Sequence, residues 1–592
     1  MSPNNNNNAI PINSILSLLE AHPLALDQYE YGTAGFRYAA TVMGPVMVRV
    51  GLVARFLLQD LVATNTATNN MGVMITASHN DESYNGVKIS NPDGSMIGPE
   101  QEALLVQWVN ERNLEKWQQQ LEQLESNNAI GCLHVGRDTR SHSLDFATLL
   151  IQAAQAMGIA VVDHGVVTTP MLHHIVLYSN TPSGSSTPTD LASHQGYLQQ
   201  MAQAYIALDQ LLLDMKKKKK QQTSTTKDDP TDKVLPPLQV DGACGVGYVA
   251  MVDLQTVLAQ LDSQEPQPIG YAHRFQPRNP PLSGPLNHEC GSEHVQKQLQ
   301  PPTWFDKKGT SAGGEDSNND DEYSYCCSVD GDADRIVFFQ SSSSSSSSSS
   351  SWTLLDGDKI AVLLAQFFQH LVQTNQLPNH LTIGVVQTAY ANGASTTYLQ
   401  EKLQLPVVIT KTGVKHLHHA AMQFDIGIYF EANGHGTVLF SPNYHQHASS
   451  SPLLQWLPKL VNPAVGDALS DLLLVDLLLR YMNWNLQDWD QQLYTDLPSR
   501  QLKVLVQDRA CISCNDNETQ ALTPTTLQPL LNQAMQALQQ YQGRCFVRPS
   551  GTENVVRIYA EASTRVLADQ LATQAAQIVY DTCQGIGPVP KI

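Results

Sequence analysis

The stretch from residue 74 to residue 90 reads Met-Ile-Thr-Ala-Ser-His-Asn-Asp-Glu-Ser-Tyr-Asn-Gly-Val-Lys-Ile-Ser. An apolar run that ends at Ile75 predicts a short buried strand, and the small polar residues after it predict a tight loop. Ser78 in this loop is a possible nucleophile, because His79 and Lys88 stand near it as potential bases. The alternative is a polar turn whose serine caps a helix.

Length and charge limit the classes of function. The chain has 592 residues, 42% of them hydrophobic, which allows about four domains with sizeable cores. Its 35 Lys and Arg against 55 Asp and Glu give a net charge of −20. Because phosphate backbones bind basic surfaces, this charge argues against nucleic acid as a partner. An anionic small molecule needs only a local cationic pocket.

Several features predict a cytoplasmic protein without a membrane partner. No run of about 20 apolar residues is present, and the N-terminus lacks the basic and hydrophobic regions of a secretory signal. The nine cysteines have no regular spacing and indicate reduced thiols. Cys511 and Cys514 form a single CxxC pair, whereas a zinc site would need a second pair.

Strand-like runs alternate with helical patterns and predict mostly parallel α/β sheets. The strands are expected near 71–75, 131–136, 158–163, 382–387, 406–410, 426–430, 502–506, 544–547 and 555–561. The helices are expected near 10–21, 45–66, 99–127, 526–541 and 564–580.

Four stretches of biased composition interrupt this pattern. They are Ser/Thr/Pro-rich 179–197, 216–234 with five lysines, acidic 306–322 and the serine tract 341–351. We interpret the first two as surface insertions or linkers, with the lysines in a solvated loop. The serine tract cannot bury apolar surface, so we expect it to be disordered.

Asp330, Asp332 and Asp334 stand between two apolar strand-like runs. Three hard oxygen ligands suit Mg²⁺ or Ca²⁺. A calcium EF-hand begins in a similar way, but it requires glycine where this chain has Arg335. An octahedral Mg²⁺ shell would need an outside oxygen, and a phosphate oxygen is the natural candidate. The alternative is a solvated acidic turn.

Two further loops offer groups for a phosphate and a sugar. Residues 548–554, Arg-Pro-Ser-Gly-Thr-Glu-Asn, are followed by Arg557. Such a turn can direct amides, hydroxyls and two guanidiniums toward an anion, and an ordinary hairpin would not explain both arginines. Residues 430–436, Phe-Glu-Ala-Asn-Gly-His-Gly, offer polar groups of the kind that vicinal sugar hydroxyls need.

With these loops in this order, the chain resembles the α-D-phosphohexomutase superfamily, in particular its phosphoacetylglucosamine mutase branch. The resemblance covers nearly the whole chain outside the insertions. The matching runs are 76–80, 330–335, 431–436 and 548–553, with further similar runs at 136–140, 168–170, 286–291, 354–359, 386–393 and 494–500.

The resemblance implies an α/β fold with four domains around a central cleft. Three would be mixed α/β sheet units, and the last a smaller C-terminal α+β phosphate-binding domain. The expected ranges are 1–197 with the serine loop, 198–340 with the metal loop, 341–470 with the sugar-binding loop and 471–592 with the phosphate-binding loop.

The resemblance also implies roles for individual residues. The phosphate on Ser78 would join Asp330, Asp332 and Asp334 around one Mg²⁺. The further catalytic residues would be His79, Lys88, Arg37 and Arg335. The substrate-binding residues would be Glu431, Ala432, Asn433, Arg548, Pro549, Ser550, Gly551, Thr552 and Arg557.

The implied reaction interconverts N-acetylglucosamine 6-phosphate and 1-phosphate, in UDP-N-acetylglucosamine biosynthesis. It would pass through phosphoserine and a sugar 1,6-bisphosphate that serves as activator and intermediate. A phosphoglucomutase or phosphomannomutase is a close alternative. A hydrolase would not need the distal phosphate loop, and a non-catalytic sugar-phosphate-binding protein would not need Ser78. Asp81 and Tyr84 depart from the superfamily's usual proline and acidic residue, so we expect altered loop rigidity.

Overall fold

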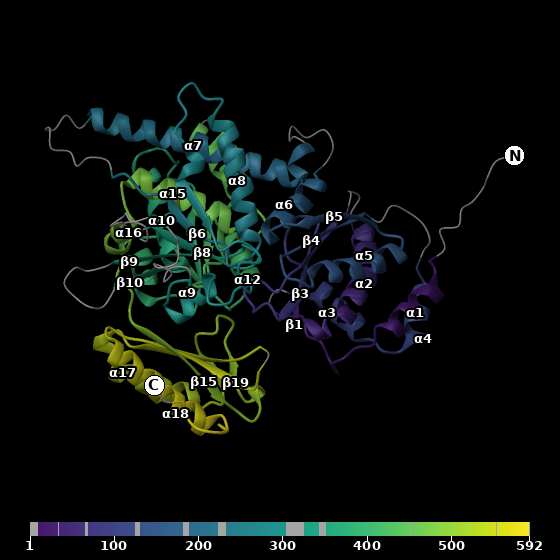
Figure 1. Ribbon diagram of the computed structural model, residues 1–592. Coiled ribbons are helices and arrows are strands. Elements are labelled where there is room, and N and C mark those ends of the chain that lie inside the picture. The colour runs from purple at the N-terminus through teal and green to yellow at the C-terminus, as the bar shows by residue number, and fades with distance from the viewer. Residues whose placement is uncertain are drawn as a thin grey trace, which may run out of the picture. The chain divides into compact units, whose positions relative to one another are not determined.

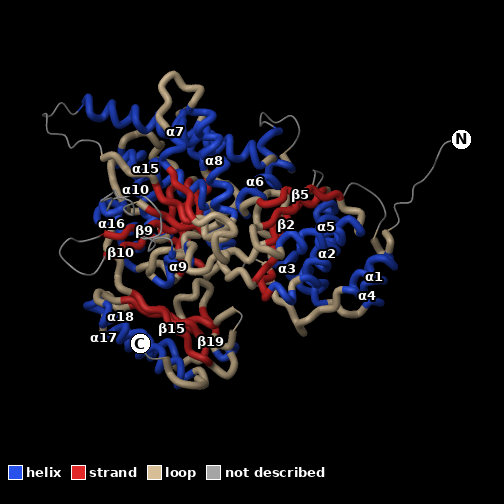
Figure 2. Tube along the Cα trace, viewed as in Figure 1, coloured by secondary structure: helices blue, strands red, loops and turns tan. Residues whose placement is uncertain are grey.

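The computed structural model describes residues 10–32, 35–64, 69–124, 131–181, 189–222, 233–303, 325–342, 351–449, 451–551, 553–590 and 592. The chain forms two compact units, each described by itself. Figure 1 labels the helices and strands along the chain, and Figure 2 colours them by type. The first comprises Met1–Gln210, Pro236–Leu354 and Lys459–Leu474, and the second comprises Leu211–Leu235, Leu355–Pro458 and Val475–Ile592. Thr552, the acidic stretch 306–322 and most of the serine tract lie outside the described residues.

The first unit begins with a five-stranded mixed sheet in the order β1-β3-β2-β4-β5. Strands β2, β4 and β5 are parallel, and β3 is antiparallel to both β1 and β2. The central strand β2 is buried along its whole length, as its continuous apolar run predicts. The strands are β1 (Phe36–Ala39), β2 (Met71–Ile75), β3 (Tyr84–Ser90), β4 (Cys132–Arg137) and β5 (Ala160–Val166).

Several helices accompany this sheet; α5 packs against β2, β4 and β5, and α2 lies against α5 (Figure 1). They are α1 (Ile12–Ala21), α2 (Gly44–Thr64), α3 (Pro99–Asn110), α4 (Leu114–Glu122) and α5 (Ser143–Ala156). The expected single helix over 99–127 is two helices. The chain breaks at Asn113, whose side chain accepts hydrogen bonds from the amides of Glu115 and Lys116 and so begins α4.

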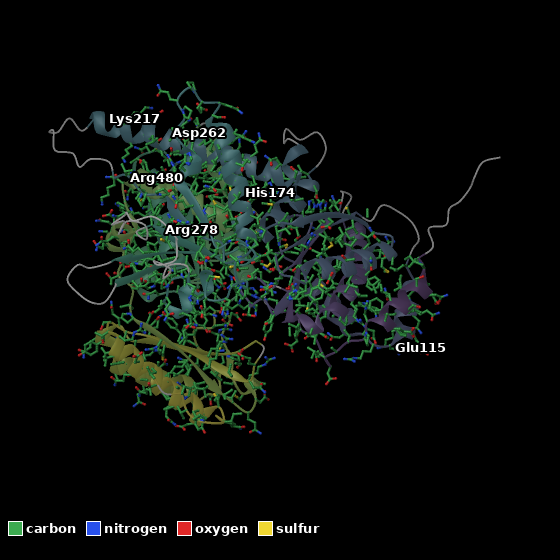
Figure 3. The ribbon with its side chains drawn as sticks, viewed as in Figure 1. Glu115, His174, Lys217, Asp262, Arg278 and Arg480 are labelled. Atoms are coloured by element: carbon green, nitrogen blue, oxygen red, sulfur yellow. The ribbon has the colours of Figure 1, made fainter. Side chains whose placement is uncertain are left out.

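The second sheet of this unit is also mixed, in the order β10-β9-β8-β6-β7. Arg278 of β7, labelled in Figure 3, donates to Gln239 of β6 at 2.8 Å and ties two parallel strands together. The strands are β6 (Leu238–Asp241), β7 (Phe275–Arg278), β8 (Cys326–Val329), β9 (Ile336–Ser342) and β10 (Ser351–Leu355). Helices α8 (Val246–Asp262) and α9 (Ser292–Gln298) pack against this sheet, whereas α6 (Thr169–Ser179) packs against β2 and β4 of the first sheet. Helix α7 (His194–Gln222) includes residues of both units.

The lysine run is helical, which corrects the expected solvated loop. Helix α7 continues through the five lysines to Gln222. Lysine loses little side-chain freedom in a helix, and buried Leu208 and Leu212 anchor the preceding turns. The same helix begins at His194, inside the stretch 179–197 that we expected to be an insertion.

The second unit contains a mixed four-stranded sheet in the order β12-β11-β13-β14. Its strands are β11 (Ile383–Thr388), β12 (Val407–Thr410), β13 (Ile426–Phe430) and β14 (Gly436–Phe440). Helices α10 (Gly357–Gln373) and α12 (Val414–Ala421) pack against it. The remaining helices of this unit are α11 (Gly393–Thr397), α13 (Pro442–Ala448) and α16 (Leu486–Gln492). Helices α14 (Pro452–Leu460) and α15 (Ala468–Met482) include residues of both units.

The C-terminal part of this unit is an antiparallel sheet in the order β15-β19-β18, which packs against α17 and α18 (Figure 1). Its elements are β15 (Ser499–Leu505), β18 (Arg544–Pro549), β19 (Val555–Glu561), α17 (Leu527–Ala537) and α18 (Arg565–Thr582). A small pair, β16 (Ser513–Cys514) and β17 (Ala521–Thr523), accompanies it.

Among the described residues, three mixed sheets, one three-stranded antiparallel sheet and the antiparallel pair of β16 and β17 confirm the predicted fold class. The expected domain boundaries and the central cleft stay predictions. Strand β10 neighbours β9 in the second sheet, although the sequence ranges placed residues 341–355 with the third domain. Among the described helices, none combines the length and hydropathy needed to cross a bilayer.

Candidate active site

Ser78 lies in the loop at the carboxyl end of β2, in the first unit. Its backbone φ is +52°, a left-handed conformation that few non-glycine residues adopt. The Ser78 amide donates to Thr76 Oγ1 at 2.9 Å. The buried Oγ donates to Asp330 Oδ2 at 2.7 Å and lies 3.5 Å from Asp334 Oδ1. The side chain therefore faces the acidic loop, and the helix-cap alternative is wrong.

Two side chains hold the carbonyls of this loop. Asn287 Nδ2 donates to the carbonyl oxygens of Ser78 at 2.7 Å and Asn80 at 3.0 Å. Arg140 Nη2 donates to the same two oxygens at 3.1 and 2.8 Å. Asp138 in turn accepts from Arg140 Nε at 2.9 Å. The strained serine backbone is thus fixed by bonds from two separate loops.

The loop continues through the two positions that depart from the superfamily. Asp81 Oδ1 accepts from the amide and the hydroxyl of Ser83, both at 3.0 Å, which closes a short turn. Arg140 Nη1 donates to the Asp81 carbonyl at 2.6 Å. Tyr84 is exposed and begins β3. Side-chain bonds therefore hold the turn that a proline would otherwise restrict.

The three aspartates of the β8–β9 loop gather their carboxylates within 4.8 Å of one another, and all three are buried. Asp330 Oδ1 accepts from the amides of Asp334 at 3.1 Å and Arg335 at 3.2 Å, which curls the loop. Burial and the charges of Asp334 and Asp332 raise the pKa of Asp330 well above its usual range. The solvated-turn alternative does not describe this arrangement.

Lys88 and Thr169 bind the other side of the cluster. Lys88 Nζ lies 2.8 Å from both Asp332 Oδ2 and Asp334 Oδ2. Thr169 Oγ1 donates to Asp332 Oδ2 at 2.6 Å. Burial opposes the charge of Lys88, but the two carboxylates outweigh it and raise the pKa of Lys88. The same ammonium helps to lower the pKa of Asp332 against its own burial.

The cluster fits a divalent cation. Among the described residues, Asp332 Oδ1 is buried without a hydrogen-bond partner. Three carboxylates face two cations, Lys88 and Arg335, so negative charge remains in excess. A small group of carboxylate oxygens with an unused lone pair is what Mg²⁺ requires of a protein.

His79, Arg335 and Arg37 lie beside the serine, and Glu293 of α9 joins them. His79 Nε2 lies 3.0 Å from Glu293 Oε2, and Arg335 Nη1 lies 3.5 Å from the same oxygen. Burial, with repulsion from Arg335, lowers the pKa of His79 to about 3, so its ring is neutral near pH 7. Burial, with repulsion from Arg335, also lowers the pKa of Arg37.

In the second unit, the loop after β13 presents Glu431 and Asn433. Glu431 Oε1 accepts from the Gly413 amide at 3.1 Å, and Glu431 Oε2 accepts from Asn433 Nδ2 at 3.1 Å. The backbone of Gly357 packs against the Glu431 carbonyl at the base of this loop. The contact requires glycine, since a Cβ at residue 357 would lie 1.9 Å from that oxygen. Ala432 receives a 3.4 Å hydrogen bond from the Gly357 amide.

The phosphate-binding loop follows β18 in the same unit. Arg548 pairs directly with Arg557 across β18 and β19, and Arg557 pairs directly with Lys503 across β19 and β15. Directly paired residues share one face of a sheet, so three cations lie in a row. Glu553 lies 3.6 Å from Arg557 and 3.5 Å from Lys503. These like charges repel one another, and a bound anion would relieve that repulsion.

Arg548 is the best-held member of this row. Its Nε donates to the Tyr390 hydroxyl at 3.1 Å, and its Nη1 lies 3.6 Å from Glu518 Oε1. Burial opposes its charge, but Tyr390, Glu518 and Glu431 together raise the pKa of Arg548. The charge of Glu431 therefore acts on Arg548, which links the sugar-binding loop to the phosphate-binding loop.

Pro549, Ser550 and Gly551 are the described residues at the end of this loop. Pro549 pairs with Val556, and the amide of buried Ser550 donates to Val555. A Cβ on Gly551 would meet no atom of the described residues within 4 Å.

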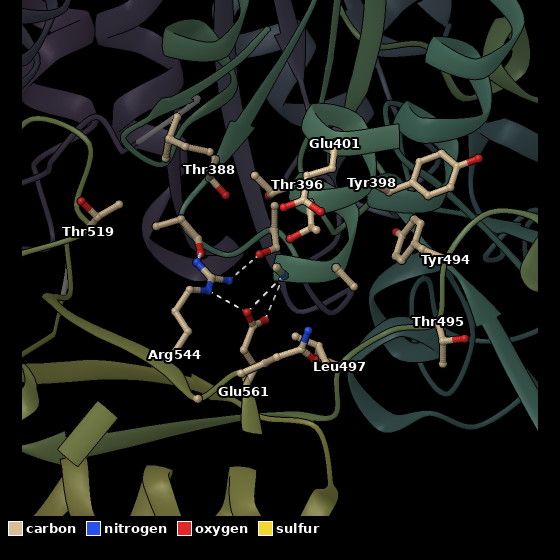
Figure 4. Close-up of a pocket in the computed structure, with 18 of the residues that line it drawn as sticks. Thr388, Thr396, Tyr398, Glu401, Tyr494, Thr495, Leu497, Thr519, Arg544 and Glu561 are labelled. Carbon is tan, nitrogen blue, oxygen red and sulfur yellow. Dashed lines mark hydrogen bonds and ion pairs between the residues drawn. The ribbon is translucent and has the colours of Figure 1, made fainter. Parts of the chain in front are cut away.

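A cavity of about 720 Å³ in the second unit is lined by other residues (Figure 4). Arg544 donates to Glu561 Oε1 at 2.7 Å and to the carbonyls of Ala389 and Ala391 at 3.0 and 2.6 Å. The lining of this cavity includes none of the predicted substrate-binding residues. Arg544 is already bonded on both sides, so it links the C-terminal sheet to residues 389–391.

The structure therefore brings together the predicted catalytic and metal-binding residues in the first unit. It brings Glu431 and Arg548 into electrostatic contact in the second. Sequence reasoning assigned no role to Thr169, Asn287, Glu293 or Lys503. The first two lie inside runs that resemble the superfamily, and Glu293 stands just after one. Only the strand register reveals Lys503.

Comparisons with known domain families match three parts of the chain. The profile described as phosphoacetylglucosamine mutase AMG1, domain III, matches residues 356–484. The phosphoglucomutase/phosphomannomutase C-terminal domain matches residues 533–578. The alpha/beta/alpha domain I of the same group matches residues 53–116 and 107–185.

Whole proteins are similar over nearly the full length. Human phosphoacetylglucosamine mutase is 38% identical over 591 residues, which cover 97% of this chain and 98% of that protein. The crystal structure of Aspergillus fumigatus N-acetylphosphoglucosamine mutase with GlcNAc-6P and magnesium has a TM-score of 0.81 and 34% identity, over 98% of this chain and 100% of that chain. A serine-to-alanine variant of that enzyme, with glucose 1,6-bisphosphate, has a TM-score of 0.79 at 34% identity over the same shares.

Proposed function

The chain belongs to the phosphoacetylglucosamine mutase family, and on this premise we propose that it interconverts N-acetylglucosamine 6-phosphate and N-acetylglucosamine 1-phosphate. The observation that carries the proposal is the Ser78 hydroxyl, bonded at 2.7 Å to one of three clustered buried aspartates. Serine alone is a poor nucleophile, and a carboxylate site for a cation beside it suits phosphoryl transfer. The product would serve UDP-N-acetylglucosamine biosynthesis.

Asp330, Asp332 and Asp334 are proposed to hold one Mg²⁺, together with an oxygen of the phosphate on Ser78. When bound, the ion supplies positive charge to the phosphoryl group in transfer. Arg335 and Arg37 would add charge on the same side. Lys88 would orient Asp332 and Asp334 and keep Asp332 ionised. Fixed charges of this kind stabilise the transition state without reorganising during the reaction.

Phosphorylated Ser78 would give its phosphoryl group to the 1-hydroxyl of the sugar 6-phosphate, forming the 1,6-bisphosphate. A pKa of about 3 makes the His79 ring a weak base, so its proposed role is to accept a hydrogen bond from that hydroxyl and orient it. Its Nε2 is held by Glu293, and its buried Nδ1 has no hydrogen-bond partner among the described residues. The Ser78 oxygen would regain a proton as it leaves. It would later attack the 6-phosphate and restore the phosphoserine.

The second unit would hold the phosphate that is not reacting. Arg548 and Arg557, with the loop of Pro549, Ser550, Gly551 and Thr552, form the proposed phosphate contact, and Lys503 extends it. Glu431, Ala432 and Asn433 would bind sugar hydroxyls. The bisphosphate must present each phosphate to Ser78 in turn, so this contact has to accept both orientations. The sugar 1,6-bisphosphate would also act as the activator that first phosphorylates Ser78.

The partner in this proposal is a small sugar phosphate, and the place of action is the cytoplasm. Nucleic acid and membrane remain unexpected partners on the grounds of net charge and hydropathy. Cytoplasmic action would be tested by fractionating cells that express the full chain and following the protein with an antibody. Recovery in a membrane or organelle fraction would overturn it.

Phosphorus NMR of the purified protein tests the reaction directly. We expect N-acetylglucosamine 6-phosphate, with Mg²⁺ and a trace of 1,6-bisphosphate, to yield a 1-phosphate signal. Glucose and mannose 6-phosphates, run in parallel, should react more slowly. A preference for either would overturn the substrate and keep the chemistry. Release of free phosphate would indicate a hydrolase, and absence of turnover would favour a sugar-phosphate-binding protein.

A further inference from the structure

Two cysteines meet in the first unit, close to the loops of Ser78 and the aspartates but outside the chemistry described above. Cys244 stands in the turn between β6 and α8, and Cys290 ends the loop that leads to α9. Both are buried and pack together with Ala243 in a small separate cluster. Their thiols are hydrogen-bonded to each other.

The backbone holds the two turns against each other. The Asn287 amide donates to the Ala243 carbonyl at 3.1 Å. Asp241 accepts from the Ala243 amide at 3.0 Å and from the Gly291 amide at 2.8 Å. A Cβ placed on Gly291 would lie only 3.1 Å from the Ala243 side chain. The two cysteines are therefore neighbours because the turns that carry them are held against each other.

The environments of the two thiols differ in a way that suits a reactive and a resolving cysteine. The bond from Cys290 lowers the pKa of Cys244 to about 7, whereas that bond and burial raise the pKa of Cys290. Cys244 Sγ also lies 3.4 Å from Ser283 Oγ. Residues 282–285, which include this serine, are exposed, and Leu282 is 94% exposed. Only a thin surface loop lies between Cys244 and solvent.

We propose that Cys244 and Cys290 form a reversible disulfide when a peroxide reaches them, and that this bond slows the mutase. The Cys244 thiolate attacks one peroxide oxygen, which gives a sulfenic acid and, with a proton, one water from hydrogen peroxide. The Cys290 thiol then attacks the sulfenic sulfur and releases a second water. The two thiols lose two electrons in all, and the peroxide gains them. A small dithiol restores both cysteines by exchange.

The bond would act on the active site through two short connections. Gly245, next to Cys244, packs so closely on Gly331 of the acidic loop that an added Cβ would lie 2.5 Å from its carbonyl oxygen. Asn287, three residues before Cys290, holds the Ser78 carbonyl at 2.7 Å. Drawing the sulfurs together displaces both turns. A misplacement of about 1 Å near reacting groups lowers rates by roughly 10- to 100-fold.

The test treats the reduced full-length protein with hydrogen peroxide, blocks free thiols and maps the peptides by mass spectrometry. We expect a linked peptide pair containing Cys244 and Cys290, and a mutase rate that falls roughly 10- to 100-fold and returns with dithiothreitol. Cys244→Ser and Cys290→Ala should each keep their rate under peroxide. Cys511→Ser is the matched control, because the pKa of Cys511 is raised to about 11, and it should remain sensitive.

Absence of the linked pair at peroxide doses that oxidise other thiols would overturn the proposal. A linked pair with an unchanged rate would overturn its connection to the active site. The effect on rate rests on the proposed mutase function, but the peptide map does not. A protein inactive in its reduced form would therefore count against the function and leave the disulfide to be judged by mass alone.

Discussion

The two units hold their polar groups in opposite ways. In the first, Ser78, Lys88 and the three aspartates are all buried and bound to one another by short bonds. In the second, Arg557 and Lys503 keep partial exposure, and their acidic partner Glu553 stands 3.5–3.6 Å away. No atom of the described residues would lie within 4 Å of a Cβ on Gly551. One set of charges is fixed, and the other can adjust.

This difference follows from the work that each set is proposed to do. Where a phosphoryl group changes bonds, charges must already point at the transition state, so a buried and fully bonded cluster is favourable. Where either end of a bisphosphate has to be held in turn, a row of cations beside the loop tolerates two orientations. Substitutions in the first unit should therefore affect kcat, and those in the second should affect KM.

The largest expected effect is that of Ser78→Ala. Removing the hydroxyl leaves no atom to carry the phosphoryl group, so kcat should fall by at least ~10⁴-fold. Binding of the sugar phosphate, measured by calorimetry, should change little. A variant that retained substantial turnover would show that the covalent step does not pass through this serine.

Asp332→Asn should lower kcat by roughly 10²–10³-fold and weaken Mg²⁺ binding. It removes charge at the carboxylate whose Oδ1 has no hydrogen-bond partner among the described residues. A Mg²⁺ titration of the rate, with chelator as the zero point, measures both effects. The control is Asp93→Asn, an exposed turn carboxylate of the same unit, which should leave the titration unchanged. If both variants gave the same Mg²⁺ titration, Asp332 would not be a ligand of the metal.

Arg548→Ala should raise KM for the sugar phosphate by roughly 10- to 100-fold, with a smaller change in kcat. Lys503→Ala should have a weaker effect of the same kind, because it lies at the end of the row. Initial rates over a range of substrate concentrations separate the two parameters. The control is Arg500→Ala on β15 of the same sheet, which breaks an ion pair with Asp569 of α18 and should match the unsubstituted protein. A loss confined to kcat would contradict the contrast between the units.

The serine, acidic and phosphate-binding loops could be predicted because their residues are local and sit between clear strands. The alternation of strands and helices predicted α/β sheets, whereas the mixed sheets and the smaller C-terminal α+β domain were implied by the resemblance. The roles of Asn287, Glu293 and Lys503 depend on contacts between distant segments, which local pattern does not contain. The prediction of a solvated loop for the lysine run was wrong. It relied on charge alone, whereas the run continues a helix whose earlier turns are anchored by buried leucines.

The smallest expected effect concerns stability. Burial raises the pKa of Asp467, which accepts a hydrogen bond from Tyr197, to about 7. Between about pH 4 and 7 the folded chain keeps this proton, while the unfolded chain releases it. The contribution of Asp467 to the free energy of unfolding therefore falls as pH rises, by at most about 1.4 kcal/mol per pH unit.

The amide in Asp467→Asn cannot release a proton. The melting temperature of this variant, relative to that of the unsubstituted protein, should therefore rise as the pH is raised from 4.5 to 7.5. Differential scanning fluorimetry at several pH values measures this gain, which we expect to be no more than a few degrees. A parallel shift at all pH values would mean that this carboxyl is not protonated in the folded chain.

The most direct test of the central claim is to locate the phosphoryl group on the protein. The purified chain would be incubated with a hexose 1,6-bisphosphate and Mg²⁺, then digested and mapped by mass spectrometry. We predict one added phosphoryl group, on Ser78, which disappears when N-acetylglucosamine 6-phosphate is supplied and bisphosphate forms. Turnover without phosphate on Ser78, or with phosphate on another residue, would contradict the account.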